Sequence, residues 1–278
     1  MSIPEVVLRS PDGATARVLP DGAQVVSWIP AGETEDRLFV SPRAEYGLGK
    51  SVRGGIPICF PQFGPFGALP QHGFARNCRW RVLGEPIAGQ VRLALTEADL
   101  PEAQAALARS GWPHAFEACL DVQVFGGTLE VALTVRNTGT GPCTFTAALH
   151  PYFAVHAATA CEVRGLAGLT YRDALQQGAL LPETASTLAI PGPLDRIYYD
   201  APDQLELREP HRTLRIEKSG FPEAVVWNPG AAGTSSRRDF QPGDEHAMLC
   251  VEAAVVRTPV TLAPGEQWTG VQRMHAGA

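Results

Sequence analysis

The chain has 278 residues, of which 45% are hydrophobic and 19% are charged, and its formal net charge is −6 at pH 7. This composition is typical of a soluble globular protein and excludes a disordered or fibrous one. No apolar run in the sequence reaches the roughly 18 residues that a membrane-spanning helix needs, so we expect no membrane association. The negative charge argues against nucleic acid as a partner, because a phosphate backbone calls for a basic face.

The N-terminus and the cysteines bear on the compartment. The first ten residues, MSIPEVVLRS, have no basic start followed by an apolar stretch, so we expect no secretory signal and a cytoplasmic location. The cysteines are scattered without a CxxC pair, which predicts buried free thiols and neither a disulfide framework nor a zinc site. We expect a monomer that needs no metal and no cofactor.

Short segments that alternate in polarity, or are apolar throughout, predict β-strands along the whole chain. In chain order the clearest are residues 5–9, 24–29, 91–96, 118–125, 128–135, 204–209 and 213–218. Tight turns are predicted at Asp12-Gly13, Asp21-Gly22 and Pro264-Gly265, and a hairpin is predicted at Gly126-Gly127. Only residues 101–109, PEAQAALAR, predict a clear helix, with Pro101 at its first position.

The number and spacing of these segments predict the fold class. Roughly fifteen or more strands spread from end to end are typical of an all-β sandwich or barrel. No linker, low-complexity tract or repeat divides the chain, so we expect one domain over residues 1–278.

Residues 52–76 stand out because they crowd polar side chains into a stretch dense in glycine and proline. Such a stretch is a shaped loop, since Gly and Pro break regular hydrogen bonding. The loop carries Arg53, Gln62, His72 and Arg76. Ordered loops that display such groups are where ligands are usually held. The alternative is a long surface connection with solvated arginines, which would have no need of the loop's four phenylalanines.

Two further residues are candidates for acid and base chemistry. His150 follows the apolar run 145–149 and precedes Pro151, which places it firmly at a strand end. Residues 247–256, AMLCVEAAVV, predict a strand that is apolar except for Glu252. A carboxylate in such a strand should have a perturbed pKa, which makes it a candidate base. The alternatives are a satisfied core histidine and a glutamate on the solvent face of an edge strand.

Six ordered stretches resemble the glucose-6-phosphate 1-epimerase branch of the aldose 1-epimerase family, over nearly the whole chain. They are RGGIPICFPQFG (53–64), LPQHGFAR (69–76), LHPYF (149–153), LDRIYYD (194–200), VWNP (226–229), and MLCVEAA with PVTLAPGEQWTGVQ (248–272). The resemblance implies a large antiparallel β-sandwich of galactose mutarotase type with few short helices. It also implies an enzyme that interconverts the α and β anomers of a hexose 6-phosphate.

The resemblance also implies roles for individual residues. Glu252 would act as the base at the C1 hydroxyl and His150 as the acid at the ring oxygen, so His150 would start protonated. We expect the nearby carboxylate to raise the pKa of His150. His72 would hydrogen-bond the anomeric region, and Asp195 would bind sugar hydroxyls. The alternative for Asp195 is a turn residue at a strand end.

Phosphate recognition would distinguish this branch from mutarotases of free sugars. Arg53 and Arg76 bracket the loop, and guanidinium groups suit phosphate oxygens, although each arginine could instead form a structural ion pair. Gln62 would serve a sugar hydroxyl or these arginines. Related sequences carry another aromatic and a lysine after the VWNP stretch, whereas this chain reads GAAGTSSRRDF. Arg237 and Arg238 are therefore candidates to compensate.

Three other functions stay open from the sequence. The first is mutarotation of free aldoses. The second is a non-catalytic sugar-binding β-sandwich, which would not need His150 and Glu252 together. The third is a metal-dependent hydrolase with His72, His150 and Glu252 as a zinc set, although no HExxH-like spacing is present.

Overall fold

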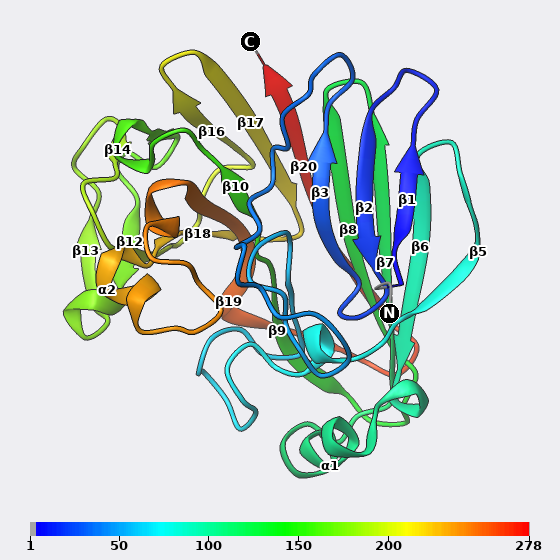
Figure 1. Ribbon diagram of the computed structural model, residues 1–278. Helices are drawn as coiled ribbons and strands as arrows, with labels where there is room; N and C mark the ends of the chain where they lie inside the picture. Colours follow the sequence, from blue (N-terminus) through cyan, green and yellow to red (C-terminus); the bar gives the residue numbers. More distant parts are fainter. Residues whose placement is uncertain (1–3, 278) are drawn as a thin grey trace.

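Residues 4–277, which the computed structural model describes, form three sheets whose paired strands are all antiparallel (Figure 1). The largest is a 9-stranded sheet with the order β14-β11-β16-β17-β20-β8-β7-β6-β5. Its strands are β5 (Arg81–Ile87), β6 (Gln90–Thr96), β7 (Phe116–Phe125), β8 (Thr128–Asn137), β11 (Glu162–Arg164), β14 (Leu188–Ala189), β16 (Gln204–Glu209), β17 (Arg212–Ser219) and β20 (Gln267–Gly277).

The second is an 8-stranded sheet with the order β13-β12-β15-β18-β19-β9-β4, in which β10 pairs with β19 off this path. Its strands are β4 (Ile58–Cys59), β9 (Cys143–Leu149), β10 (Tyr152–Ala154), β12 (Thr170–Asp173), β13 (Ala179–Pro182), β15 (Leu194–Tyr198), β18 (Glu223–Asn228) and β19 (Met248–Leu262). A 3-stranded sheet contains β1 (Val6–Arg9), β2 (Thr15–Leu19) and β3 (Gln24–Ile29). In Figure 1 its blue strands lie beside β6 and β7.

The core lies between the sheets and is filled by every second side chain of their strands. In β7, alternate residues from Phe116 to Val124 are buried, as a strand with one covered face requires. One continuous cluster of buried side chains draws on all three sheets, with Val18 from β2, Val131 from β8 and Val251 from β19. Burial of this apolar surface is the main force that holds the sheets together.

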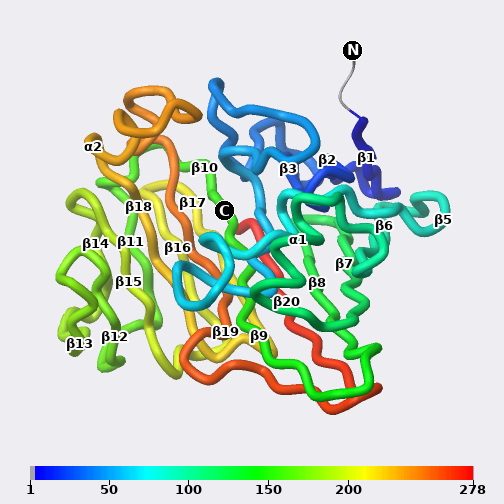
Figure 2. Tube along the Cα trace, turned by 90° about the horizontal axis from the view of Figure 1, so that it is seen from below, coloured from blue at the N-terminus to red at the C-terminus, as the bar shows by residue number. Residues whose placement is uncertain are grey.

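The 8-stranded sheet is covered on its second face as well. Along β19, Val251 and Ala253 face the main core, whereas Cys250 and Ala254 belong to smaller clusters on the other face. The chain after β4 lies over that face, and Figure 2 shows this cyan loop beside β9 and β19. Coverage on both faces explains why β19 is apolar almost throughout its first half.

The structure confirms the all-β antiparallel fold and each of the strands named from the sequence, with ends that differ by a few residues. The predicted helix is α1 (Glu102–Gly111), but Pro101 lies at its N-cap and not at its first helical position. A second short helix, α2 (Gly230–Ser235), was not predicted, because GAAGTS has no apolar periodicity. All six cysteines are free, and all but the half-buried Cys119 are buried.

Candidate active site

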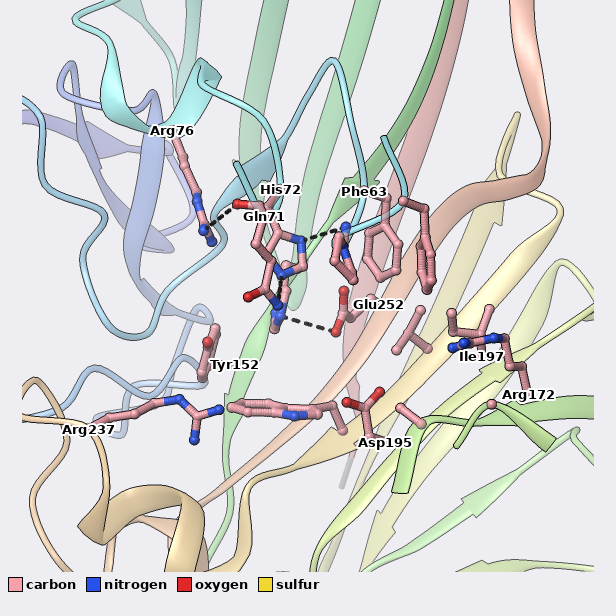
Figure 3. Close-up of a pocket in the computed structure, with 18 of the residues that line it drawn as sticks. Phe63, Gln71, His72, Arg76, Tyr152, Arg172, Asp195, Ile197, Arg237 and Glu252 are labelled. Atoms are coloured by element: carbon pink, nitrogen blue, oxygen red, sulfur yellow. Dashed lines mark hydrogen bonds and ion pairs between the residues drawn. The ribbon is translucent and has the colours of Figure 1, made fainter. Parts of the chain in front are cut away.

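The outer face of the 8-stranded sheet forms the floor of a pocket of about 510 Å³ (Figure 3). Paired residues of neighbouring strands point to the same face of a sheet, so the register fixes which side chains are neighbours on the floor. One row of cross-strand neighbours consists of Glu252, Val225, Ile197 and Arg172. The adjacent row consists of Tyr152, Cys250, Trp227 and Asp195. The floor therefore carries charged groups at both ends of an apolar middle.

The Gly- and Pro-rich loop supplies the upper wall of the pocket. It enters the fold through Gly55, whose φ of 61° is left-handed and whose backbone passes so close to β3 that a Cβ would lie 2.2 Å from the Val25 carbonyl oxygen. Only glycine fits there. The chain then pairs with β9 through β4 and turns over the sheet, which brings Phe63, His72 and Arg76 to the pocket.

His150 and Glu252 meet at one end of the floor. The His150 Nε2 atom lies 3.2 Å from the Glu252 Oε1 atom, and the two residues are only 7% and 2% exposed. Since β19 lies between β18 and β9, Glu252 is not on a solvent-facing edge strand. Within the described residues, His150 Nδ1 and Glu252 Oε2 are buried without a hydrogen-bond partner. Both groups therefore keep hydrogen-bonding capacity that no protein atom in this part of the chain uses.

Burial also sets the acid and base strength of this pair. Burial raises the pKa of Glu252 well above its ordinary value, with a further contribution from Asp195. Burial lowers the pKa of His150 well below its ordinary value, and His72, Arg76 and Arg53 act in the same direction. The expectation that Glu252 would raise the pKa of His150 is therefore wrong, because desolvation and the nearby positive charges outweigh that attraction.

His72 lies over the pair, with its ring centroid 5.7 Å from that of His150 in an edge-on arrangement. Burial, together with Arg76 and Arg53, lowers the pKa of His72 to about 3, so its ring is neutral at pH 7. The Gly64 N–H donates to His72 Nδ1 at 3.3 Å, which leaves the ring proton on Nε2. His72 thus has a neutral ring, and its Nε2 atom also lies 3.3 Å from the side-chain amide of Gln71.

The predicted binding residues Arg53 and Arg76 both lie at the pocket but differ in their hydrogen-bond and ion-pair partners. Arg53 donates to the Tyr152 hydroxyl at 2.8 Å and to Asp239 Oδ2 at 3.1 Å, so it is both a pocket residue and a structural ion pair. Arg76 donates to the Gln71 carbonyl oxygen at 3.0 Å. Its guanidinium forms no ion pair within residues 4–277. Figure 3 shows Arg76 on the same side of Glu252 as Tyr152.

Asp195 and Gln62 differ in where the structure places them. Asp195 lies on β15 with its carboxylate at the pocket and is not a turn residue. Burial raises the pKa of Asp195, an effect to which Asp173 adds and which Arg172 and Arg237 oppose. Gln62 is not among the pocket residues. Its side chain is buried under the loop, where it donates to the carbonyl oxygens of Gly64 and Leu69 and accepts from the Leu69 N–H.

Sequence reasoning missed several residues of the pocket. Tyr152 and Trp227 lie within the LHPYF and VWNP stretches but were not selected as site residues. Arg172 on the short strand β12 carries no local signal. The divergent segment after VWNP forms α2 and brings Arg237 to the pocket, whereas Arg238 is 79% exposed and pairs with Glu45.

No three His, Cys, Asp or Glu side chains within residues 4–277 are grouped so that they could hold a metal ion. The zinc set of His72, His150 and Glu252 is therefore not assembled. Neither α1 nor any other helix in this part of the chain is long and apolar enough to cross a membrane.

Comparison with known proteins decides the family. The profile of the aldose 1-epimerase family matches residues 4–275. The chain belongs to the aldose 1-epimerase family. Among curated members, a Cenchrus ciliaris protein named "Putative glucose-6-phosphate 1-epimerase" is 38% identical over 96% of this chain and 82% of its own length. An Escherichia coli K12 protein of the same name is 32% identical over 84% of this chain and 77% of its own length.

Solved structures of the family share this fold. A structure titled as a putative mutarotase from Salmonella typhimurium superimposes with a TM-score of 0.86 at 29% identity, and covers 98% of this chain and 90% of its own. A galactose mutarotase-like protein from Lactobacillus casei superimposes with a TM-score of 0.77 at 15% identity, over 99% of this chain and 100% of its own. The likeness confirms the galactose mutarotase-type fold that the sequence predicted.

Proposed function

We propose that this aldose 1-epimerase family member interconverts the α and β anomers of a hexose 6-phosphate, with glucose 6-phosphate as the expected substrate. The observation that carries the proposal is the contact between His150 and Glu252 on the floor of a pocket whose walls also hold guanidinium groups. The names of the related plant and bacterial proteins support the same substrate.

The proposed reaction needs one base and one acid. Glu252 removes the proton from the C1 hydroxyl, the C1–O5 bond breaks as C1=O1 forms, and His150 delivers a proton to O5. Rotation about C1–C2 then presents the other face of the aldehyde. The ring recloses when His150 takes the proton back from O5 and Glu252 returns its proton to O1. A residue within hydrogen-bond reach of each oxygen is the geometric requirement for this cycle.

The pKa directions disfavour the charged pair that starts the step but make each of its two groups more reactive. A raised pKa makes the Glu252 carboxylate a stronger base, and a lowered pKa makes the protonated His150 ring a stronger acid. The pair holds the same number of protons before and after the step, because O5 takes one proton from His150 while O1 gives another to Glu252. Burial favours the neutral forms that the step produces. His72 donates its Nε2 proton to an oxygen of the anomeric region.

The position of the phosphate follows from the connectivity of the sugar. The phosphate is on C6, and C6 is bonded to C5, which carries the ring oxygen that His150 protonates. The phosphate must therefore lie on the His150 side of the ring. The ring centroids of Tyr152 and His150 lie 4.9 Å apart in a stacked arrangement, and the Tyr152 hydroxyl accepts a hydrogen bond from Arg53. The His150 side of the pocket therefore carries a positively charged guanidinium. Arg53, Arg76 and Arg237 are the proposed phosphate ligands.

We also propose that the protein works as a monomer in the cytoplasm. The proposed catalytic and binding side chains all come from one chain, and six free thiols suit a reducing compartment. Light scattering after gel filtration tests the oligomeric state. A dimer that dissociates only with loss of activity would contradict it.

The function is tested by two-dimensional exchange NMR on equilibrated anomers, with glucose 6-phosphate and glucose compared at equal concentration. We expect the protein to accelerate exchange of the phosphate ester far more than that of free glucose. Faster exchange of glucose would indicate a mutarotase of free aldoses. Binding of both sugars without any exchange would indicate a non-catalytic sugar-binding protein.

A further inference from the structure

Arg172 lies at the end of the pocket floor that the proposed mechanism does not use. It belongs to the same row of cross-strand neighbours as Glu252, separated from it by Val225 and Ile197. Three strand spacings make this separation roughly 14 Å between Cα atoms. Figure 3 shows Asp195 and Arg172 on one side of Glu252, and Arg76 and Tyr152 on the other.

The guanidinium of Arg172 packs between the loop and a turn, and its N–H groups have no protein partner among the described residues. Its Cζ atom lies 4.9 Å from the ring centroid of Phe66, so one face of the guanidinium is stacked on the loop. Gly178 of the β12–β13 turn lies beside it, and a Cβ there would lie 2.4 Å from Arg172 Nη2. Within residues 4–277, Arg172 forms neither a hydrogen bond nor an ion pair, although its guanidinium carries five N–H donors.

Asp195 is the matching acceptor. It lies two residues before Ile197 on β15, and Ile197 is paired with Arg172, so Asp195 and Arg172 are diagonal neighbours on the floor. The Asp195 carboxylate also has no hydrogen-bond or ion-pair partner in the described part of the chain. A donor fork and a carboxylate acceptor side by side suit two adjacent hydroxyl groups, one of which donates while the other accepts.

The ring chemistry says which hydroxyls these are. In a pyranose, the atoms opposite C1 and O5 are C4 and C3. If C1 and O5 lie at Glu252 and His150, the C3–C4 edge is the part of the ring farthest from the catalytic pair. That edge then extends across the apolar middle of the floor, over Val225 and Ile197, toward Arg172 and Asp195.

We propose that Arg172 is a specificity-determining residue that binds the C3–C4 hydroxyl edge of the hexose 6-phosphate together with Asp195. This inference rests on the proposed function, and it names the hydroxyl groups by which the pocket recognises the sugar. The enzyme should discriminate at C4 and tolerate change at C2. It should therefore turn over mannose 6-phosphate, the C2 epimer, more nearly like glucose 6-phosphate than galactose 6-phosphate, the C4 epimer.

A purely structural role for Arg172 makes a different prediction. Arg172 could act only by holding Phe66 and the loop above the pocket, in which case its loss would weaken every substrate equally. Arg172→Met keeps an unbranched side chain against Phe66 but removes the donors. Phe66→Leu removes the stacking partner and leaves the donors, so it is the matched control. Arg172→Lys keeps the charge without the planar fork.

The experiment compares these variants on glucose 6-phosphate and on its 2-deoxy, 3-deoxy and 4-deoxy analogues. Exchange NMR measures kcat/KM, and tryptophan fluorescence measures Kd independently of turnover, since Trp227 lies in the pocket. We expect Arg172→Met to lose about tenfold to a hundredfold on glucose 6-phosphate and the 2-deoxy analogue. One of the 3-deoxy and 4-deoxy analogues already lacks the hydroxyl that Arg172 binds. On that analogue, Arg172→Met and the wild type should have nearly the same kcat/KM and Kd.

Equal losses on all four sugars, or a Phe66→Leu variant that reproduces the pattern of Arg172→Met, would overturn the assignment. An Arg172→Met variant with wild-type values would overturn it as well. Failure of the proposed function is a separate result, in which the wild-type protein does not accelerate exchange of glucose 6-phosphate. The Kd series on the deoxy analogues still tests Arg172 in that case.

Discussion

His72 shows how one residue combines backbone strain with a defined protonation state. Its φ of 69° lies in the left-handed region, which costs energy for a side chain other than glycine or asparagine. That backbone places the ring between Phe63 and His150, where Gly64 fixes its tautomer. The proposed donor role requires a neutral ring, and burial supplies it. Keeping the His72 ring neutral should therefore reduce the stability of the folded protein at acid pH.

We predict that the His72→Asn variant becomes more stable relative to the wild type as the pH falls from 7 to 4. The folded-state pKa of His72 is lowered to about 3, so the unfolded chain binds more protons between pH 6.5 and 3. The wild type therefore loses stability over this range, whereas asparagine does not titrate. Asparagine tolerates the left-handed backbone. Thermal melting at several pH values measures the difference, and a constant difference would contradict the prediction.

The arginines around the pocket differ in their partners, and this difference makes the phosphate assignment testable. We predict that Arg76→Ala and Arg237→Ala each lower kcat/KM for glucose 6-phosphate about tenfold to a hundredfold, from a loss of about 1.5 to 3 kcal/mol per charge-assisted hydrogen bond. Exchange of free glucose should change far less, because it has no phosphate. The ratio of the two losses is the measured quantity.

Arg238→Ala is the matched control, because Arg238 adjoins Arg237 in sequence but pairs with Glu45 away from the pocket. It should leave both substrates unchanged. Arg53→Ala should also lower the melting temperature, since Asp239 then loses a partner at 3.0 Å. Equal losses on phosphorylated and free glucose for Arg76→Ala would show that it does not bind phosphate.

At the scale of elements, the loop over the sheet depends on the buried Gln62 side chain. We predict that Gln62→Leu destabilises the protein by about 1 to 3 kcal/mol, because the Leu69 N–H and two carbonyl oxygens lose their partner under the loop. It should weaken phosphorylated and free sugars alike, since Gln62 is not at the pocket. Denaturant unfolding and exchange NMR measure the two effects. Selective loss of the phosphorylated substrate would contradict this structural role.

The strands were predictable because each carries its own local pattern, whereas the pocket depends on register. The alternation of apolar and polar residues in β7 and the apolar run of β19 each predict a strand without further information. Arg172 becomes a pocket residue only because β12 pairs with β15 in a particular register. No local pattern in TYRD indicates that pairing. α2 was missed for a related reason, since its glycines and alanines favour no element by themselves.

At the scale of the whole molecule, the fold builds its site on the outer face of a sheet whose inner face forms the core. The sheet positions Glu252 and Asp195, and the loop before β5 supplies a wall of the pocket beside Glu252, which is 2% exposed. The sequence singled out His150 and Glu252, and the structure brings both to the pocket, but the sequence predicted the wrong direction for the pKa of His150. That direction depends on burial and on charges from distant segments, which only the folded structure brings together.

If His150 and Glu252 open and close the sugar ring as a pair, then both should be needed for anomer exchange of glucose 6-phosphate, which NMR measures in the Glu252→Gln and His150→Ala variants. We predict that each variant loses at least about a hundredfold in exchange rate while it stays folded. Glu252→Gln should keep its melting temperature, because it replaces a costly buried carboxylate with a neutral group of the same shape. Exchange near the wild-type rate in either folded variant would contradict the account.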